Sequence, residues 1–222
     1  MKERTAPRRQ PRPVYYTREQ LDELCEKIIT NFCMERYGQE LTPVPTEALL
    51  QLLEEHALKV DQLAELPDGI NGVTEYYWDH KPIVKIDARL TQQHWRETRR
   101  RTTICHECGH AIQHAPLWRA LGPERPGDGP VAQSCRCEYD DHSLSQWDVW
   151  MEWQAGYMSG SFLMPKNKVC RLAQRLAEAK RWRVPLPAGS PPTIYLAEHV
   201  VIAFHVSSEA AAVRLKQLGF IA

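Results

Sequence analysis

The sequence predicts a mainly helical α+β protein with a small antiparallel sheet and a helical appendage at its C-terminal end. Apolar residues recur at steps of three and four over several long segments, which is typical of amphipathic helices. β-Branched and aromatic residues gather between positions 72 and 87, which is typical of strands. The chain has 222 residues, enough for one to two domains, and it contains no internal repeat.

Residues 1–16 predict a disordered basic tail. Lys and Arg outnumber acidic residues there, prolines interrupt it, and it has no apolar run whose burial could offset the entropy of ordering. Thr17 is the expected N-cap of an amphipathic helix that extends to Tyr37. A second, short helix is expected after Thr46, with its leucines directed inward.

Two strand-like segments, 72–78 and 81–87, predict a hairpin within the small sheet. A helical pattern resumes after Thr91 and is expected to run to about residue 115, because Pro116 should stop it. Residues 116–146 are rich in Gly and Pro and predict a long loop. A loop of that length in a compact domain usually has a function or lacks order.

The last third of the chain is predicted to be helical. An aromatic-rich helix is expected over 145–164 and ends before Pro165, and a charged helix follows over 166–182. Two short helices are expected over 194–205 and 208–218. The predicted organisation is therefore a tail over 1–16, a main domain over 17–165 and a C-terminal helical region over 166–222 that resembles a helix-turn-helix.

The composition argues against a nucleic-acid-binding or membrane protein. The 28 basic residues balance 28 acidic ones, which argues against a polyanionic partner such as nucleic acid. No apolar run is long enough for a signal peptide or a membrane span, so we expect no membrane association. The seven cysteines are an odd number and are best interpreted as reduced thiols in the cytoplasm.

The helix after Thr91 contains His106-Glu107-Cys108-Gly109-His110, an H-E-x-x-H motif. Because a helix turns about 100° per residue, the two histidines lie one turn apart on one face and reach one metal ion. Zinc suits such a site, which keeps one position open for water, although manganese, cobalt and iron accept the same ligands. We expect Glu107 to be the general base. A helix whose histidines only form hydrogen bonds is the alternative.

A hydrolytic zinc site needs a third protein ligand, and Glu152 is the leading candidate. Glu152 lies on the next strongly helical segment, where apolar neighbours would hold its carboxylate still. A solvent-facing Glu on an amphipathic helix is the alternative. A straight helix carries His114 out of reach of the metal. The other candidates for the third ligand are His114, His142, Asp148 and Glu138.

Two separated motifs resemble the ImmA/IrrE family of metallopeptidases. The first is the H-E-x-x-H helix. The second is Glu152-Trp-Gln-Ala155-Gly-Tyr-Met-Ser159-Gly-Ser-Phe-Leu163-Met-Pro165, which is similar to the family's Glu-x-x-Ala-Asn-x-Phe-Ala-x-x-Leu-Leu-Met-Pro helix. The resemblance covers roughly residues 70–220.

This resemblance implies a zincin-like metallopeptidase domain. In it His106, His110 and Glu152 would bind zinc and Glu107 would be the catalytic carboxylate. Members are typically intracellular proteases linked to mobile elements or stress responses, and several act on helix-turn-helix repressors. The resemblance therefore implies a protein substrate, namely a transcriptional regulator.

The chain departs from the family pattern at several positions. Gly156 replaces the usual Asn, Met158 and Ser159 replace Phe-Ala, and Cys108 takes a position that is commonly Leu. The spacer between His110 and the second motif is longer than usual. The missing Asn affects a local hydrogen bond rather than the metal, and the long spacer predicts a loop that shapes or covers the cleft.

A second hypothesis is a non-cleaving protein that contacts DNA or a regulator through its two C-terminal helices. The would-be recognition helix has only Arg214 and Lys216 as cations, few for the phosphate contacts that dominate DNA affinity. The peptidase hypothesis is therefore preferred.

The remaining Cys, Arg and Trp patterns are expected to have structural rather than catalytic roles. Cys108 is expected to face the core, so Cys105-x-x-Cys108 is not expected to be a redox pair, and Cys135 and Cys137 are expected to be free thiols. Arg96, Arg99, Arg100 and Arg101 are expected to form a solvated surface, and Trp147, Trp150 and Trp153 a core stripe. Candidates to stabilise an oxyanion are His142, Tyr139, Tyr157 and Tyr195.

Overall fold

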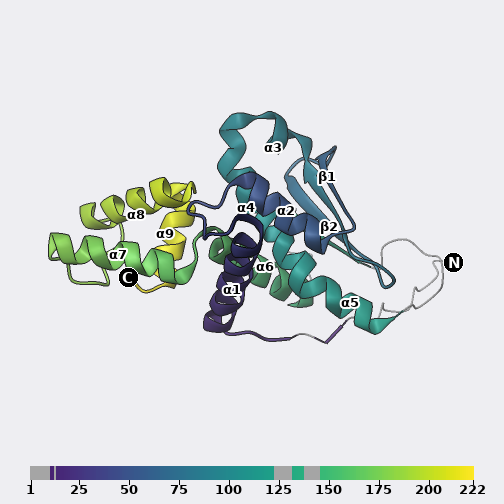
Figure 1. Ribbon diagram of the computed structural model, residues 1–222, viewed down its shortest axis with the longest axis horizontal. Coiled ribbons are helices and arrows are strands. Elements are labelled where there is room, and N and C mark those ends of the chain that lie inside the picture. Colours follow the sequence, from purple (N-terminus) through teal and green to yellow (C-terminus); the bar gives the residue numbers. More distant parts are fainter. Residues whose placement is uncertain (1–10, 13, 123–131, 138–145) are drawn as a thin grey trace.

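The computed structural model describes residues 11–12, 14–122, 132–137 and 146–222, with backbone alone for 132–137 and 146–148. The protein is mainly helical with a small sheet, as the sequence predicts. The sheet lies toward one end of the molecule, and the helices α7 (Lys166–Lys180), α8 (Pro191–Phe204) and α9 (Ser208–Gln217) form the opposite end (Figure 1). Between these ends α4 (Glu97–Gly109) packs against α6 (Gln146–Leu163), and this contact positions the candidate site.

The sheet is mixed rather than antiparallel. Its order is β1-β3-β2-β4, where β2 and β3 form the predicted antiparallel hairpin. β1 runs parallel to β3, and β4 runs antiparallel to β2. The sequence analysis missed β1 because its residues, KVDQLA, lack the β-branched and aromatic run that marks β2. The strands are β1 (Lys59–Ala64), β2 (Ile70–Tyr76), β3 (Ile83–Asp87) and β4 (Ala132–Cys137).

The first two helices begin and end close to the predicted residues. α1 (Arg18–Tyr37) starts at Thr17, whose side chain forms a capping box with Gln20. It ends at Gly38, whose φ of 70° is in the left-handed region that glycine tolerates. α2 (Thr46–His56) buries Leu49, Leu52 and Leu53 as predicted, whereas Leu50, which is also expected to point inward, is only half-buried.

The helical segment that carries the H-E-x-x-H motif is longer than predicted. A turn of π-helix, His110–His114, follows α4 (Glu97–Gly109) and leads into α5 (Ala115–Leu121). The expected stop at Pro116 is wrong, because the proline occupies the first turn of α5, where its missing N–H has no intrahelical partner to lose. The predicted loop over 116–146 also contains β4. Two short helices precede α4: α3 (Ala88–Gln92) and a 3₁₀ turn (His94–Arg96).

The C-terminal helices agree with the sequence predictions. α6 ends just before Pro165, and Ser207 caps α9 by accepting a hydrogen bond from the Ala210 amide. Among the described residues no single helix is long and apolar enough to cross a bilayer; α8 and α9 meet that criterion only as a pair bent by 109°. These helices are α6 (Gln146–Leu163), α7 (Lys166–Lys180), α8 (Pro191–Phe204) and α9 (Ser208–Gln217).

One cluster of buried apolar side chains connects the two ends of the chain. It includes Leu21 of α1, Phe162 of α6 and Leu215 of α9, so residues on both sides of the predicted boundary at 165 share it. The segment before α1 also has contacts: the Val14 carbonyl accepts a hydrogen bond from α6, and the ring of Tyr15 packs edge-on against Trp150. Contacts therefore begin before the predicted end of the tail at residue 16, while residues 1–10 and 13 lie outside the described part.

A buried ion pair joins α1 to α9. Arg214 Nη2 lies 2.7 Å from Asp22 Oδ1, and both side chains are almost fully buried. Asp22 also accepts hydrogen bonds from Ser161 at 2.8 Å and Tyr157 at 3.0 Å, while Arg214 Nε donates to the Met164 carbonyl at 3.1 Å. Every partner of this pair lies on α1, α9 or the end of α6, so it ties these helices together.

Replacing Arg214 with Met is expected to lower the free energy of unfolding by about 3–5 kcal/mol, because Asp22 would stay buried without its charge partner. Urea unfolding at neutral pH measures the change. Lys216→Met is the matched control, since Lys216 is exposed on the same helix and its replacement should change the free energy by about 0.5 kcal/mol or less. Equal effects of the two replacements would contradict this role for the ion pair.

Candidate metal centre

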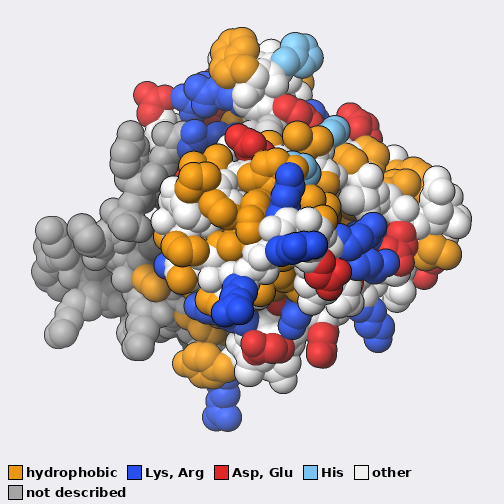
Figure 2. Space-filling model, turned by 90° about the vertical axis from the view of Figure 1, so that its left-hand side faces the viewer, with side chains coloured by type: hydrophobic (Ala, Val, Ile, Leu, Met, Phe, Trp, Pro, Cys, Tyr) orange, Lys and Arg blue, Asp and Glu red, His pale blue; other side chains and the backbone are white. Residues whose placement is uncertain are grey.

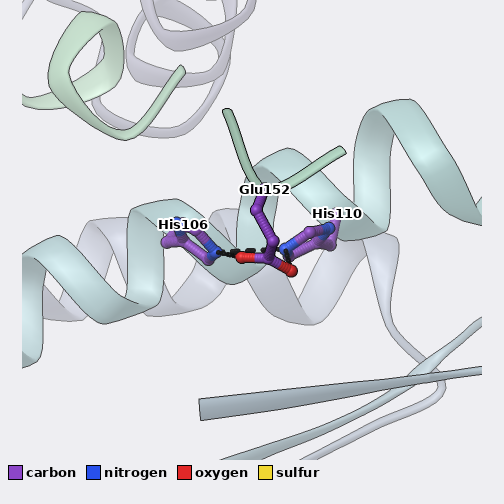
Figure 3. A group of neighbouring side chains, drawn as sticks. All are labelled: His106, His110 and Glu152. Atoms are coloured by element: carbon purple, nitrogen blue, oxygen red, sulfur yellow. Dashed lines mark hydrogen bonds and ion pairs between the residues drawn. The ribbon is translucent and has the colours of Figure 1, made fainter. Parts of the chain in front are cut away.

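Three side chains from two helices meet beside the α4–α6 contact. His106 and His110 project from the end of α4 and the π-helical turn that follows it, and Glu152 of α6 approaches them from the other side (Figure 3). Glu152 Oε2 lies 2.9 Å from His106 Nε2, and Glu152 Oε1 lies 3.2 Å from His110 Nε2. The two Nε2 atoms are 3.1 Å apart. The structure thus brings together the three residues that the sequence selects as ligands.

The spacing of these atoms fits a metal ion. Ligand atoms about 2.0–2.1 Å from a tetrahedral zinc ion lie about 3.3 Å from one another. The two Nε2 atoms are 3.1 Å apart, and each lies close to that distance from one oxygen of the Glu152 carboxylate, His106 at 2.9 Å from Oε2 and His110 at 3.2 Å from Oε1. Both imidazoles are buried, and Glu152 is half-buried. The group could therefore hold a metal ion.

The two imidazoles keep the Glu152 carboxylate charged. Burial by itself raises the pKa of Glu152, because desolvation penalises the charged form. The charge of His110 and the hydrogen bonds from His106 and His110 outweigh burial and leave this pKa below its ordinary value. Glu152 is therefore ionised at neutral pH, which is the form that ligates a cation.

Behind His110 lies a second, fully buried histidine. The π-helical turn brings His114 Nδ1 to 2.9 Å from His110 Nδ1, on the side of the ring that faces away from Glu152. His114 therefore does not join the ligand group, although the straight-helix argument missed its contact with His110. Burial and the charge of His110 lower the pKa of His114 to about 3.

The sequence analysis also missed Tyr76 and Gln154. The hydroxyl oxygen of Tyr76 lies 3.0 Å from His110 Nδ1, and Gln154 Oε1 lies 3.1 Å from His114 Nε2. Gln154 is two residues from a predicted ligand, which could have marked it for attention. Nothing in the sequence marks Tyr76, because it contacts His110 only as a result of the packing of β2 beside α4.

Glu107 occupies a different position from the three ligands. Its side chain is fully buried, and Oε2 accepts a hydrogen bond of 2.6 Å from the Thr74 hydroxyl on β2. A Cβ atom added at Gly72 would lie 2.9 Å from Glu107 Cδ and closer still to Oε1, so only glycine leaves room for this carboxylate. β2 thus holds Glu107 in one orientation.

The remaining candidates lie away from the ligand group or outside the described residues. Tyr157 donates to Asp22 in the core, and Tyr195 packs against Trp182 and His199 near the C-terminal end. Neither is placed to stabilise an oxyanion at the three ligands. The side chains of Glu138, Tyr139, His142, Asp148 and Trp147, and those of Cys135 and Cys137, lie outside the described part.

A groove of about 630 Å³ opens from the ligand group along α4, α6 and α9. Its wall includes His106 and Glu152, and Gly156 and Gly160 follow at four-residue steps on the same side of α6. A Cβ atom at either glycine would meet no atom within 4 Å. Gly156 stands where the resemblance expects Asn, so this departure widens the groove one helical turn from Glu152.

The arginines near the motif are partly exposed and partly buried, and Cys108 is buried. Arg101 is buried and donates to Thr46 on α2, so the expectation of a wholly solvated Arg surface is wrong. Arg99 is exposed and lines the groove. Cys108 faces the core as expected: it is buried, and burial raises the pKa of its thiol well above the ordinary value. Such a thiol is unreactive.

The helix pair α8–α9 lacks a basic face. α9 contains two basic residues, of which Arg214 is committed to Asp22 in the core and Lys216 is exposed. Figure 2 shows the C-terminal end of the molecule, where Lys and Arg side chains lie among hydrophobic and acidic ones. This face does not present the continuous positive charge on which binding to phosphates depends.

Comparison with protein-family models finds no model that matches this chain, and comparison with curated protein sequences finds no match. The strongest single feature of the site is the group His106, His110 and Glu152, which could hold a metal ion and of which His106 and Glu152 line the groove.

Proposed function

We propose that this protein is a zinc-dependent metallopeptidase, in which His106, His110 and Glu152 bind the metal and Glu107 is the general base. The observation that carries the proposal is the group itself: two imidazole nitrogens 3.1 Å apart, each within 3.2 Å of an oxygen of one carboxylate. Two imidazoles and one carboxylate are the protein ligands of zinc peptidases, which keep one further position open.

The groove offers room for a peptide beside the proposed metal site. It is about 630 Å³ in volume, and two of the three proposed ligands, His106 and Glu152, lie in its wall. A zinc ion held by His106, His110 and Glu152 would supply a Lewis acid that polarises a carbonyl group and makes a water molecule more acidic. The open space at Gly156 and Gly160 lets the backbone of a peptide approach α6 closely.

Glu107 would take a proton from the attacking water and pass it to the leaving amine. Its carboxylate is restrained by the Thr74 hydroxyl and by the lack of a side chain at Gly72. A fixed carboxylate loses little entropy when it accepts the proton, which favours this role. Its burial against β2 also limits access of bulk water.

The resemblance to the ImmA/IrrE family supports a protein substrate, and a helix-turn-helix repressor is the class we propose. The alternative, a protein that binds DNA without cleaving it, is disfavoured because Arg214 is used inside the fold. That leaves Lys216 as the exposed cation of α9.

The test is zinc-dependent cleavage. Protein purified without chelator is expected to contain about one zinc ion per chain, and to cleave peptides in a mixed library that includes repressor-derived sequences. Mass spectrometry measures both the metal and the cleavage products. Dialysis against a chelator should abolish cleavage, and added zinc should restore it. Cleavage that persists after the metal has been removed would contradict the proposal.

A further inference from the structure

A chain of buried hydrogen-bonding groups runs from the N-terminal segment to the rear of His110. Gln154 Nε2 donates to the Val14 carbonyl at 3.1 Å, and Gln154 Oε1 lies 3.1 Å from His114 Nε2. His114 Nδ1 then lies 2.9 Å from His110 Nδ1. Gln154, His114 and His110 are all fully buried, so water does not compete for the contacts among these three side chains, whereas Val14 is exposed.

The first contact sets the direction of the others. A main-chain carbonyl only accepts hydrogen bonds, so the amide nitrogen of Gln154 must face Val14. The amide oxygen of Gln154 must then face His114, and since that oxygen also only accepts, His114 Nε2 must carry a proton. A histidine that binds a metal ion through Nε2 carries its proton on Nδ1, and in His110 that nitrogen faces His114 Nδ1 at 2.9 Å.

With the proposed metal bound, His110 must consequently donate from Nδ1. If Tyr76 donated to His110 Nδ1 instead, the proton of His110 would lie on Nε2, the atom that faces Glu152 and would bind the metal. The Nδ1–H of His110 is therefore directed at two acceptors, His114 Nδ1 at 2.9 Å and the hydroxyl oxygen of Tyr76 at 3.0 Å. In neutral His110 this leaves the lone pair on Nε2, which faces the ligand group.

We propose that His114 and Gln154 are positioning residues that hold His110 with its proton on Nδ1 and its Nε2 lone pair directed at the metal, with the Val14 carbonyl as the anchor. The proposal rests on the proposed metal site and deepens it. Histidine ligands usually donate their second N–H to a carboxylate, a carbonyl or water. In this protein the acceptor is the imidazole of His114, and the side-chain amide of Gln154 fixes the position of the His114 proton.

The test compares two replacements of His114 that have nearly the same shape. His114→Asn keeps an acceptor close to the position of Nδ1, whereas His114→Leu removes it. Zinc affinity, measured by competition with a chromogenic chelator, is expected to fall about 10–100-fold in His114→Leu, as it does when outer partners of ligands are lost. His114→Asn should recover most of that loss. Gln154→Met should lie between wild type and His114→Leu.

Nitrogen chemical shifts of the imidazoles give a second readout that does not need metal. In ¹⁵N-labelled wild-type protein without metal, we expect His114 to be protonated at Nε2 alone and His110 to be protonated at Nδ1. In Gln154→Met the preference of His114 for Nε2–H should weaken. Thermal unfolding of each variant reports whether it is folded. If His114→Leu does not fold, the imidazole nitrogen chemical shifts of the wild-type protein decide the proposal.

The outcomes separate this proposal from the proposed function. Protonation of His114 at Nδ1, or equal zinc affinity of His114→Asn and His114→Leu when both are folded, would overturn the role of His114 and leave the metallopeptidase intact. A wild-type protein that binds no zinc contradicts the proposed function, and the nitrogen shifts then decide the proton positions by themselves.

Discussion

Replacing Glu107 with Gln is expected to lower kcat for peptide hydrolysis about 10²–10⁴-fold, because the amide cannot take the proton from water. The zinc content should not change, since Glu107 is turned toward Thr74 rather than toward the three ligands. Steady-state kinetics on a peptide identified from the library, together with metal analysis of the same samples, measures both quantities. A Glu107→Gln protein that retains its turnover would end the proposed role of this residue.

Gly72→Ala gives a matched perturbation of the same carboxylate. The added methyl group would overlap the position of the Glu107 carboxylate and displace it without changing its chemistry. We expect kcat to fall while zinc content stays at the wild-type level. Leu63→Ala is the control, because Leu63 is exposed on β1 of the same sheet and its truncation adds no atom beside Glu107.

Replacing Glu152 with Ala is expected to remove most of the bound zinc, because the site then keeps only its two imidazoles. The loss of affinity should exceed the roughly 10–100-fold that follows the loss of an outer partner of a ligand. Metal content by mass spectrometry and affinity by chelator competition measure it. Peptide hydrolysis should be lost in parallel.

Val149→Ala is the control for Glu152→Ala. Val149 is exposed on the same helix, three residues away, so its replacement changes α6 without touching the ligand group. It should bind zinc as the wild-type protein does. If Glu152→Ala binds zinc as tightly as this control, Glu152 is not a ligand.

The sequence by itself determined most of the helices and the local part of the site. The capping box at Thr17, the apolar spacing of α2 and the stop at Pro165 depend on residues within a few positions of one another. The H-E-x-x-H spacing is equally local, since a single helical turn brings His106 and His110 together. Glu152 was selected by its place on the next strong helix and by the family resemblance, and the fold brings it to both histidines.

Only the tertiary structure decided what lies behind and beside that motif. The parallel pairing of β1, the position of Glu107 against Gly72 and the burial of Arg214 against Asp22 all join residues far apart in the chain. The contact of His114 with His110 depends on a π-helical turn, which spacing counted along a regular helix does not reveal. Such contacts arise where elements pack, and packing depends on the whole set of buried surfaces rather than on local sequence.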